Sequence, residues 1–321
     1  MSMVSQCSHL AVIPLAALWI ACAPPAVAQE KKLEITMIFQ TEEGFGFFNP
    51  VKKGAEDAAA LVGVHVEFLC ASGSLERYES LLGQALSAKP DGVALTIIDD
   101  RADRDEVCAL VKVGIPVIAY TVDDSKGAKG SCRLAFIGQD FVATGYLIGK
   151  RMIAEADIKG GDLVLTPVDS PDAVYAILRQ RGVDKAMKEV GARTEIPGAG
   201  FKDAEILASQ MKYLGSHPNV KAIIGIGLPQ VEMAIKATES IKRPIPIGGF
   251  DLSQSMIDGI ESGKVVATVD QQPYTQGFHS VMQLIHKVHY GLDPSDMKTG
   301  GDGLVDKPNN TLSEAGLGKQ R

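Results

Sequence analysis

Aromatic, acidic and amide side chains recur directly after the strands that the sequence predicts. Phe47 and Phe48 follow the first such strand, and Asp251 and Gln271 follow two later ones. Carboxylates accept hydrogen bonds from hydroxyl groups, amides both accept and donate them, and aromatic rings cover apolar faces. This mixture is suited to binding a neutral polyol. The strand-end segments are 40–48, Asp99-Asp100, 121–125, 169–171, 227–229, Asp251 and 270–273.

Motifs for catalysis or cofactor binding are absent from the sequence. There is no phosphate-binding P-loop, no Gly-x-Ser-x-Gly elbow and no His-Glu-x-x-His zinc motif. Gly225-Ile226-Gly227 lacks the third glycine of a dinucleotide fingerprint. His286 and His289 share a predicted helix, but no carboxylate or cysteine lies at metal-ligand spacing. We therefore expect no enzymatic activity, no metal and no cofactor.

The strand-end loops separate elements that alternate along the chain. Strands are expected at 33–39, 64–70, 92–98 and 115–121 and then at 134–138, 163–168, 220–226, 245–250 and 265–269. Helices are expected at 49–62, 75–88, 103–113, 144–155, 172–190, 202–214, 230–240, 253–262 and 275–290, with 300–310 irregular apart from one short strand. This alternation predicts the α/β class, with two doubly wound parallel sheets packed around a cleft.

Length and charge narrow the function classes. The chain has 321 residues, which suggests about two domains. Its 32 basic and 39 acidic residues give a formal charge of −7, and no basic block stands out. A nucleic-acid partner is therefore not expected.

The first 28 residues have the composition of an export signal. They contain no Lys, Arg, Asp or Glu, residues 10–23 are apolar, and Ala26-Val27-Ala28 forms a small-x-small cleavage site. We expect a signal peptide at 1–28 and a periplasmic mature protein that begins at Gln29. The alternative is a lipoprotein that is acylated at Cys22.

Three cysteines follow the predicted leader: Cys70, Cys108 and Cys132. An odd number in an exported chain leaves at least one thiol without a disulfide partner. We interpret all three as separate, partly buried thiols.

Several motifs occur in the order found in one known family. They include Phe47-Phe48, Lys89-Pro90-Asp91-Gly92, Ile137-Gly138-Gln139-Asp140, Arg179-Gln180-Arg181-Gly182 and Gly248-Gly249-Phe250-Asp251. With these motifs the chain resembles the ribose-binding-protein-like periplasmic binding proteins, the sugar-capturing subunits of ABC importers, over about residues 33–310. The resemblance implies two lobes joined by three hinge strands that cross near Gly138, near Gln271 and near 298–301. Lobe one would hold 33–138 and 272–298, lobe two 139–271 and 299–310, and residues 311–321 would form a tail.

The resemblance also implies the ligand contacts. Phe47 and Phe48 would hold the sugar ring from lobe one, although a packed helix start would also explain them. Arg179 would bind ring hydroxyls, and its alternative is a solvated helix face. Asp251 would accept two hydroxyls, and its alternative is an N-cap. Three further contacts are implied. Phe201 would contact the ligand, although a core position would also explain it. Gln271 would contribute the hinge amide, and the hydroxyl of Thr121 could bind a ligand hydroxyl.

Some positions depart from the family pattern. Phe45 replaces an asparagine before the aromatic pair, Thr121-Val122 replaces Asp-Arg after the fourth strand, and Gly227 replaces another asparagine. These changes argue against ribose itself. Glu42-Glu43 is an additional acidic pair, which indicates either a solvated loop or an amine-bearing ligand.

The sequence thus predicts a monomeric periplasmic solute-binding protein that captures a small sugar or polyol by hinge closure and delivers it to an ABC permease. Two alternatives share the fold. One is a binding protein that serves a chemoreceptor or sensor, and the other is the core of a sugar-responsive regulator. A regulator would need a DNA-binding segment before Leu33, where the sequence has the leader instead.

Overall fold

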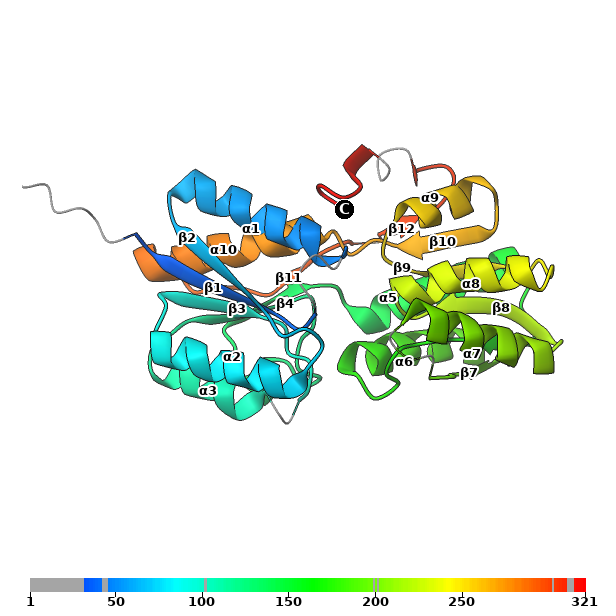
Figure 1. The fold of residues 1–321 in the computed structure, drawn as a ribbon, viewed down its shortest axis with the longest axis horizontal. Helices are drawn as coiled ribbons and strands as arrows, with labels where there is room; N and C mark the ends of the chain where they lie inside the picture. The colour runs from blue at the N-terminus through cyan, green and yellow to red at the C-terminus, as the bar shows by residue number, and fades with distance from the viewer. Residues whose placement is uncertain are drawn as a thin grey trace, which may run out of the picture. The chain divides into compact units, whose positions relative to one another are not determined.

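Two six-stranded sheets organise the chain (Figure 1). The computed structural model describes residues 32–41, 46–100, 103–198, 200, 202–301, 303–310 and 315–321. The predicted signal peptide and the pair Glu42-Glu43 lie outside these residues. None of the helices among the described residues is long and apolar enough to cross a membrane.

The first sheet has the strand order β11-β5-β4-β3-β1-β2, and its described strands all pair in parallel. Its strands are β1 (Glu34–Phe39), β2 (His65–Cys70), β3 (Gly92–Leu95), β4 (Val117–Tyr120), β5 (Ala135–Gly138) and β11 (Met297–Lys298). One face of the sheet is covered by α1 and α10 and the other by α2 and α3. These helices are α1 (Phe48–Val62), α2 (Leu75–Ala88), α3 (Arg104–Lys112) and α10 (Pro273–Tyr290).

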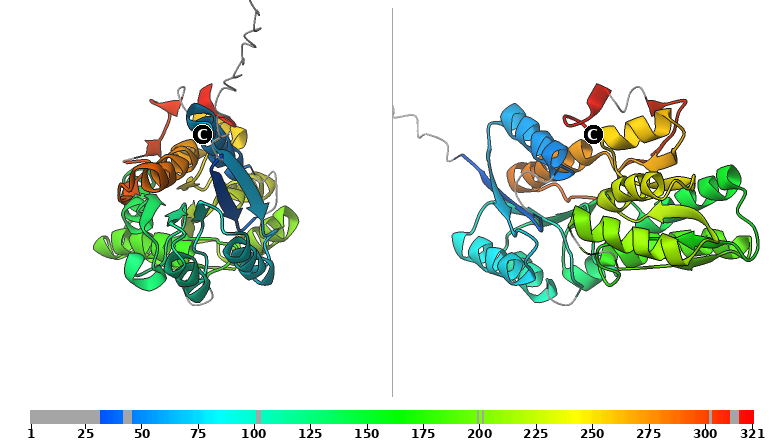
Figure 2. Two further views of the ribbon diagram at one scale, coloured as in Figure 1. Left: turned by 90° about the vertical axis from the view of Figure 1, so that its left-hand side faces the viewer. Right: turned by 45° about the vertical axis from the view of Figure 1, so that its right-hand side comes forward.

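The second sheet has the order β12-β10-β9-β8-β6-β7, with only the β10–β12 pair antiparallel among the described strands. Its strands are β6 (Leu163–Leu165), β7 (Arg193–Glu195), β8 (Val220–Gly225), β9 (Ile247–Phe250), β10 (Val265–Val269) and β12 (Leu304–Val305). Helices cover both faces, as the further views in Figure 2 also show. They are α5 (Phe141–Ala156), α6 (Val174–Glu189), α7 (Asp203–Ser216), α8 (Leu228–Ser240) and α9 (Gln254–Glu261).

The predicted fold class is confirmed, because each sheet with its helices forms an α/β lobe of mostly parallel strands. We call the lobe of the first sheet lobe one and the lobe of the second sheet lobe two. The residue limits predicted for the lobes stay predictions. Three short elements were missed by the sequence analysis: α4 (Ala128–Ser131), β7 and β11. They have two to four residues each, which is too short for hydrophobic periodicity to reveal.

The chain passes between the sheets three times. The crossings lie between β5 and α5, between β10 and α10, and between β11 and β12. Gln276 of α10, which is fully buried, connects the last two of them. Its Nε2 donates to the backbone oxygen of Gln271 at 3.1 Å and to Oγ1 of Thr299 at 3.0 Å. The carboxyl ends of β10 and β11 therefore meet around a buried amide.

Glycines let the helices that carry site residues approach one another closely. A Cβ atom on Gly145 of α5 would lie 2.1 Å from the backbone oxygen of Arg179 in α6. A Cβ atom on Gly277 of α10 would lie 1.9 Å from the backbone oxygen of Val51 in α1. Since both neighbours are backbone atoms, any larger residue would push the helices apart. The two glycines thus fix the positions from which Arg179 and the start of α1 reach the strand ends.

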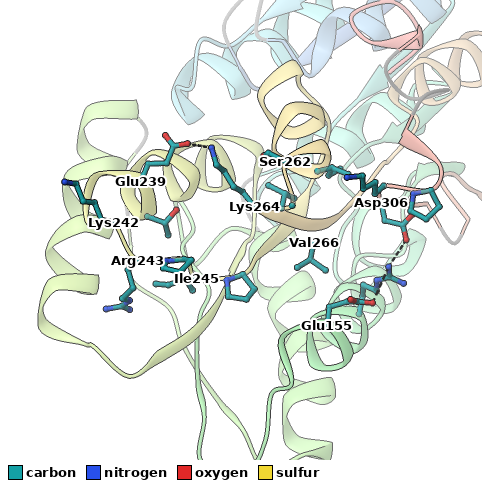
Figure 3. Close-up of a pocket in the computed structure, with 18 residues that line it drawn as sticks. Glu155, Glu239, Lys242, Arg243, Ile245, Ser262, Lys264, Val266 and Asp306 are labelled. Atoms are coloured by element: carbon teal, nitrogen blue, oxygen red, sulfur yellow. Dashed lines mark hydrogen bonds and ion pairs between the residues drawn. The ribbon is translucent and has the colours of Figure 1, made fainter.

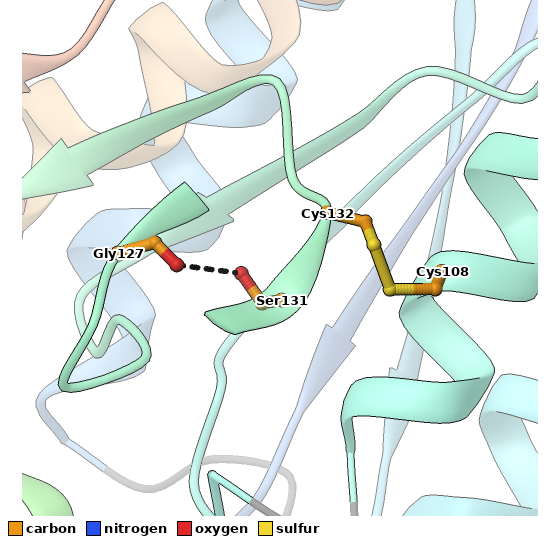
Figure 4. Close-up of a disulfide and its surroundings, with 4 residues drawn as sticks. All are labelled: Cys108, Gly127, Ser131 and Cys132. Atoms are coloured by element: carbon orange, nitrogen blue, oxygen red, sulfur yellow. Dashed lines mark hydrogen bonds between the residues drawn. A yellow bond between two sulfur atoms is a disulfide. The ribbon is translucent and has the colours of Figure 1, made fainter. Parts of the chain in front are cut away.

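Two of the predicted thiols are in fact a disulfide. Cys108 of α3 is bonded to Cys132, which directly follows α4, across a sequence separation of 24 residues (Figure 4). The prediction of separate thiols is wrong for this pair. The spacing along the chain could not show the pairing, because β4 and the following turn bring the two residues together only in the folded lobe. Cys70 takes no part in this disulfide.

Replacing both Cys108 and Cys132 by serine should lower the stability of lobe one. A cross-link that spans 24 residues removes chain entropy from the unfolded state, and this stabilises the fold by roughly 3 kcal/mol. Thermal denaturation should show a lower melting temperature for the double variant. A reductant should lower the melting temperature of the wild-type protein to the same value and leave the variant unchanged. Equal melting temperatures for the oxidised wild type and the variant would contradict this expectation.

Candidate ligand-binding site

Asp251 lies at the carboxyl end of β9 and Gln271 at the carboxyl end of β10, where the topology predicts a ligand site. Gln271 Nε2 donates to Asp251 Oδ1 at 2.6 Å, and both side chains are buried. Asp251 has a φ angle of +71°, which is uncommon for a residue other than glycine. Two hydrogen bonds hold it there: its N–H donates to the backbone oxygen of Val269 at 2.8 Å, and Thr268 Oγ1 donates to its backbone oxygen at 2.7 Å.

The side chain of Arg179 approaches Asp251 from α6, which packs against one face of the second sheet. Its side chain is only 3% exposed, so the alternative of a solvated helix face is wrong. Nη1 donates to the backbone oxygen of Ile226 at 2.6 Å, and Nη2 lies 3.8 Å from Asp251 Oδ1. The guanidinium carbon lies 4.1 Å from the ring centre of Phe250 and 4.8 Å from that of Phe141. The cation is thus held between aromatic rings and directed at the carboxylate.

Burial shifts the pKa values of this pair in opposite directions. Desolvation raises the pKa of Asp251, and both the Arg179 charge and the Gln271 hydrogen bond oppose that rise. Desolvation lowers the pKa of Arg179, and the negative charge of Asp251 opposes the change. Arginine stays protonated at any physiological pH, so the site keeps a permanent buried cation.

Two buried polar atoms of the cluster have no hydrogen-bond partner among the described residues. They are Nε of Arg179 and Oε1 of Gln271. A buried polar atom without a partner costs about 1–3 kcal/mol, so such atoms are informative when they gather at one place. One is a donor and the other an acceptor, and a hydroxyl group can serve both kinds of atom.

The predicted aromatic pair divides between two roles. Phe48 is 6% exposed and packs in the core of lobe one, with its ring centre 5.1 Å from that of Phe39. Phe47 is partly exposed, lies edge-on to Phe48 at 5.1 Å and lines a cavity with Asp251 and Gln271. Phe47 therefore lines the cavity together with Asp251 and Gln271, while Phe48 packs against it from the core of lobe one.

Thr121 lies at the end of β4 with a φ angle of +61°. Its hydroxyl donates to Oε1 of Gln276 at 2.6 Å, within the buried junction of the crossings. Its contact with a ligand stays a prediction. Phe201 lies outside the described residues, and so does the departure at Phe45.

The cavity that Phe47, Asp251 and Gln271 line has a volume of about 210 Å³. Lobe one contributes Gly46, Phe47, Asn49, Pro50 and Pro273. The remaining lining comes from Leu228, 251–254, Asp270, Gln271, Leu317, Gly318 and Arg321. Both lobes therefore contribute to one small cavity at the carboxyl ends of their strands.

A larger hollow of about 760 Å³ lies elsewhere on lobe two (Figure 3). It surrounds the amino ends of β9 and β10, and the ion pairs Lys264–Glu239 and Arg151–Asp306 border it. Ligands of open α/β sheets bind at the carboxyl ends of the strands, and no aromatic ring lines this hollow. We therefore take the cavity lined by Phe47, Asp251 and Gln271 as the candidate site.

Sequence reasoning missed three residues that the structure brings to the site. Asp270 precedes Gln271 and lines the same cavity. Tyr175 lies with its ring centre 5.6 Å from the Arg179 guanidinium carbon and donates a hydrogen bond to Asp169. Asp169 and Asp270 both belong to strand-end segments, and that position was the available signal. No group of three or more potential metal ligands is present within the described part of the chain.

Known proteins match this chain along most of its length. The sequence profile of the periplasmic binding protein domain matches residues 35–290. The xylose/arabinose-binding protein XylF of Sulfolobus acidocaldarius is 28% identical over 247 residues, or 72% of this chain. The chain spans only 60% of the length of that relative.

Two further proteins are similar to the chain. The ribose import binding protein RbsB of Bacillus subtilis is 25% identical over 235 residues, covering 71% of this chain and 72% of RbsB. A solved carbohydrate transporter from Acidothermus cellulolyticus 11B, in complex with myo-inositol, is 27% identical with a TM-score of 0.81. That match covers 89% of this chain and 98% of the other.

Replacing Arg179 by alanine should destabilise lobe two. The change removes a cation packed against Phe250 and leaves the Asp251 carboxylate buried without its partner, at a cost of roughly 3–5 kcal/mol. Urea denaturation should show the loss. Arg181→Ala is the matched control, because Arg181 lies on the same helix with its side chain exposed and should change stability by less than about 0.5 kcal/mol. Equal losses for the two variants would show that Arg179 is not part of a buried pair.

Proposed function

The chain belongs to the periplasmic binding protein domain family, as its motifs predicted, and we propose that it captures a small neutral sugar or polyol between its two lobes. The observation that carries this proposal is the cavity that Phe47, Asp251 and Gln271 line together, with the buried guanidinium of Arg179 beside the Asp251 carboxylate. Charged and amide groups on one side and an aromatic face on the other suit a ring that carries hydroxyl groups.

In the proposed mechanism the hydroxyls of the ligand take up hydrogen bonds that the site leaves open. Asp251 Oδ2 makes no hydrogen bond to another described residue, so it can accept from a hydroxyl while Oδ1 stays bonded to Gln271. Arg179 Nε donates to a hydroxyl oxygen, and Gln271 Oε1 accepts from another. Phe47 covers the apolar face of the ring, and Phe201 and Thr121 are proposed to add contacts. Movement of the lobes about the three crossings then excludes water and strengthens these bonds.

The ligand class follows from chemistry rather than from a single relative. Xylose, arabinose, ribose and myo-inositol, which the names of the similar proteins mention, are all small and neutral and carry several hydroxyls. The changes at Phe45, Thr121-Val122 and Gly227 remove polar groups that a ribose site would use. We propose xylose, arabinose or an inositol before ribose.

We further propose that the protein acts without catalysis or a cofactor, as a monomer, and delivers its ligand to the permease of an ABC importer. The homologues are sugar-binding transport proteins, which supports this role. The two alternative functions, a binding protein of a chemoreceptor or sensor and the core of a sugar-responsive regulator, are supported by the shared fold alone.

Replacing Asp251 by asparagine should weaken sugar binding by about tenfold to a hundredfold. The substitution keeps the shape but removes the charge that strengthens bonds to hydroxyls, each worth roughly 1.5–3 kcal/mol. Calorimetric titration with D-xylose, L-arabinose, D-ribose and myo-inositol measures the change. Asp258→Asn on the exposed side of α9 is the control and should bind like the wild type. Unchanged affinity of Asp251→Asn for the sugar that binds the wild type would refute the assignment of the site.

Export should remove the first 28 residues. The apolar run at 10–23 and the site Ala26-Val27-Ala28 are the basis of this expectation. Intact-mass spectrometry of the periplasmic fraction should show a chain that begins at or near Gln29. An acylated chain that begins at Cys22 would support the lipoprotein alternative, and a full-length cytoplasmic chain would contradict export.

A further inference from the structure

A segment from the far end of the sequence borders the candidate site. Residues 315–321, drawn in red in Figure 1, lie close to α1 and α9, and Leu317, Gly318 and Arg321 line the same cavity as Phe47. Nη1 of Arg321 lies 2.6 Å from Oδ2 of Asp270. The resemblance to the family predicts no role for this segment, and the proposed function does not use it.

Oδ2 of the buried Asp270 carboxylate requires a hydrogen-bond donor, and Arg321 supplies it. Its side chain is 4% exposed, and Oδ1 accepts a hydrogen bond from the backbone N–H of Gln272 at 2.8 Å. Oδ2 would be left buried without its ionic partner if Arg321 withdrew, and a buried, unpaired carboxylate is costly. Any departure of Arg321 therefore favours the arrival of another hydrogen-bond donor.

The cavity with the segment in place is small for a ligand. Its volume is about 210 Å³, whereas small-molecule sites usually measure roughly 300–1,000 Å³. A sugar that reaches Asp251 and Gln271 must therefore gain space. The lining residues from 315–321 can supply it, because they belong to no strand and to neither lobe's core.

Backbone hydrogen bonds within residues 315–321 would let this segment move away from the cavity without unfolding. The N–H of Gly318 donates to the backbone oxygen of Arg321 at 2.7 Å. The N–H groups of Lys319, Gln320 and Arg321 donate to the backbone oxygen of Gly316 at 2.8–3.1 Å. Departure breaks none of these bonds. The Arg321 side chain is 28% exposed, so water can solvate the guanidinium as it withdraws.

We propose that Asp270 is a further ligand-binding carboxylate and that Arg321 occupies its place until a sugar hydroxyl displaces it. This inference rests on the proposed function, since it concerns the same cavity and the same class of neutral polyol. The segment then acts as an internal competitor: it keeps the Asp270 carboxylate paired, and it lowers the affinity for the ligand. Because the competition depends on an ion pair, salt weakens it.

Calorimetric titration of three variants tests the proposal with D-xylose, L-arabinose, D-ribose and myo-inositol. Arg321→Ala and a chain that ends at residue 314 should each bind the sugar of the wild type about three- to tenfold more tightly. Lys319→Ala is the matched control, since this exposed cation lies in the same segment, and it should bind like the wild type. Unchanged or weaker binding by Arg321→Ala would overturn the proposal, because the segment would then be inert or a wall of the site.

Salt and Asp270 provide a second readout that a merely structural segment would not change. Raising the salt from about 0.05 to about 0.5 M should tighten sugar binding by the wild type but not by Arg321→Ala. Asp270→Asn should bind the sugar more weakly than Arg321→Ala does. The double variant Asp270→Asn/Arg321→Ala should have the same sugar affinity as Asp270→Asn alone. A full gain in the double variant would exclude Asp270 as the shared partner.

Hydrogen exchange without sugar separates this inference from the proposed function. Amides of 315–321 should exchange faster in Asp270→Asn than in the wild type, and Lys319→Ala should not differ from the wild type. If the wild type binds a sugar but exchange and affinity do not respond to Asp270 or Arg321, only this inference fails. If no variant binds any of the four sugars, the proposed ligand class is wrong, and so is displacement of Arg321 by a sugar. The exchange data would still show whether Arg321 holds residues 315–321 in place.

Discussion

The buried amide of Gln276 is the interaction on which the geometry of the site depends. It accepts a hydrogen bond from Thr121 and donates to Gln271 and Thr299, so it joins the end of β4 to two of the three crossings. Thr299 Oγ1 also donates to the backbone oxygen of Gln271 at 2.8 Å. Strands that end at a cleft leave backbone groups without sheet partners, and here buried side chains satisfy them. The same bonds fix Gln271, and through it Asp251.

The proposed site combines ligand recognition with a cost in the free energy of unfolding. Burial raises the pKa values of Asp251 and Asp270. A carboxyl group whose pKa is higher in the folded protein than in the unfolded chain stabilises the fold at pH values below its unfolded pKa. That contribution is lost as the pH rises through the raised value. Hydroxyl recognition needs the ionised form, which accepts more strongly. The condition that suits binding is thus the one in which these acids stabilise the fold least.

Sequence reasoning located the elements better than the orientation of their side chains. The helix expected at 75–88 has these bounds in the structure, where the side chain of Ser74 caps its first turn. Phe47 and Phe48 are adjacent, and one step along a helix turns a side chain by about 100°, so only the packing of α1 decides which ring enters the core. The disulfide and the pairing of Asp270 with Arg321 join residues that no local pattern relates.

Two carboxylates at neighbouring strand ends are paired with arginines in different ways, and burial decides the difference. Arg179 is 3% exposed, lies against Phe250 and donates to a backbone oxygen, so it cannot leave without unpacking lobe two. Arg321 is 28% exposed and comes from a segment whose backbone bonds close within itself. Burial therefore favours a fixed pairing that preorganises Asp251, whereas the more exposed Arg321 suits the exchange that we propose. In the proposed site, Asp251 stays paired with Arg179, and Asp270 pairs with Arg321 when no ligand is bound. Two buried carboxylates can then share one cavity, and neither is left without a partner.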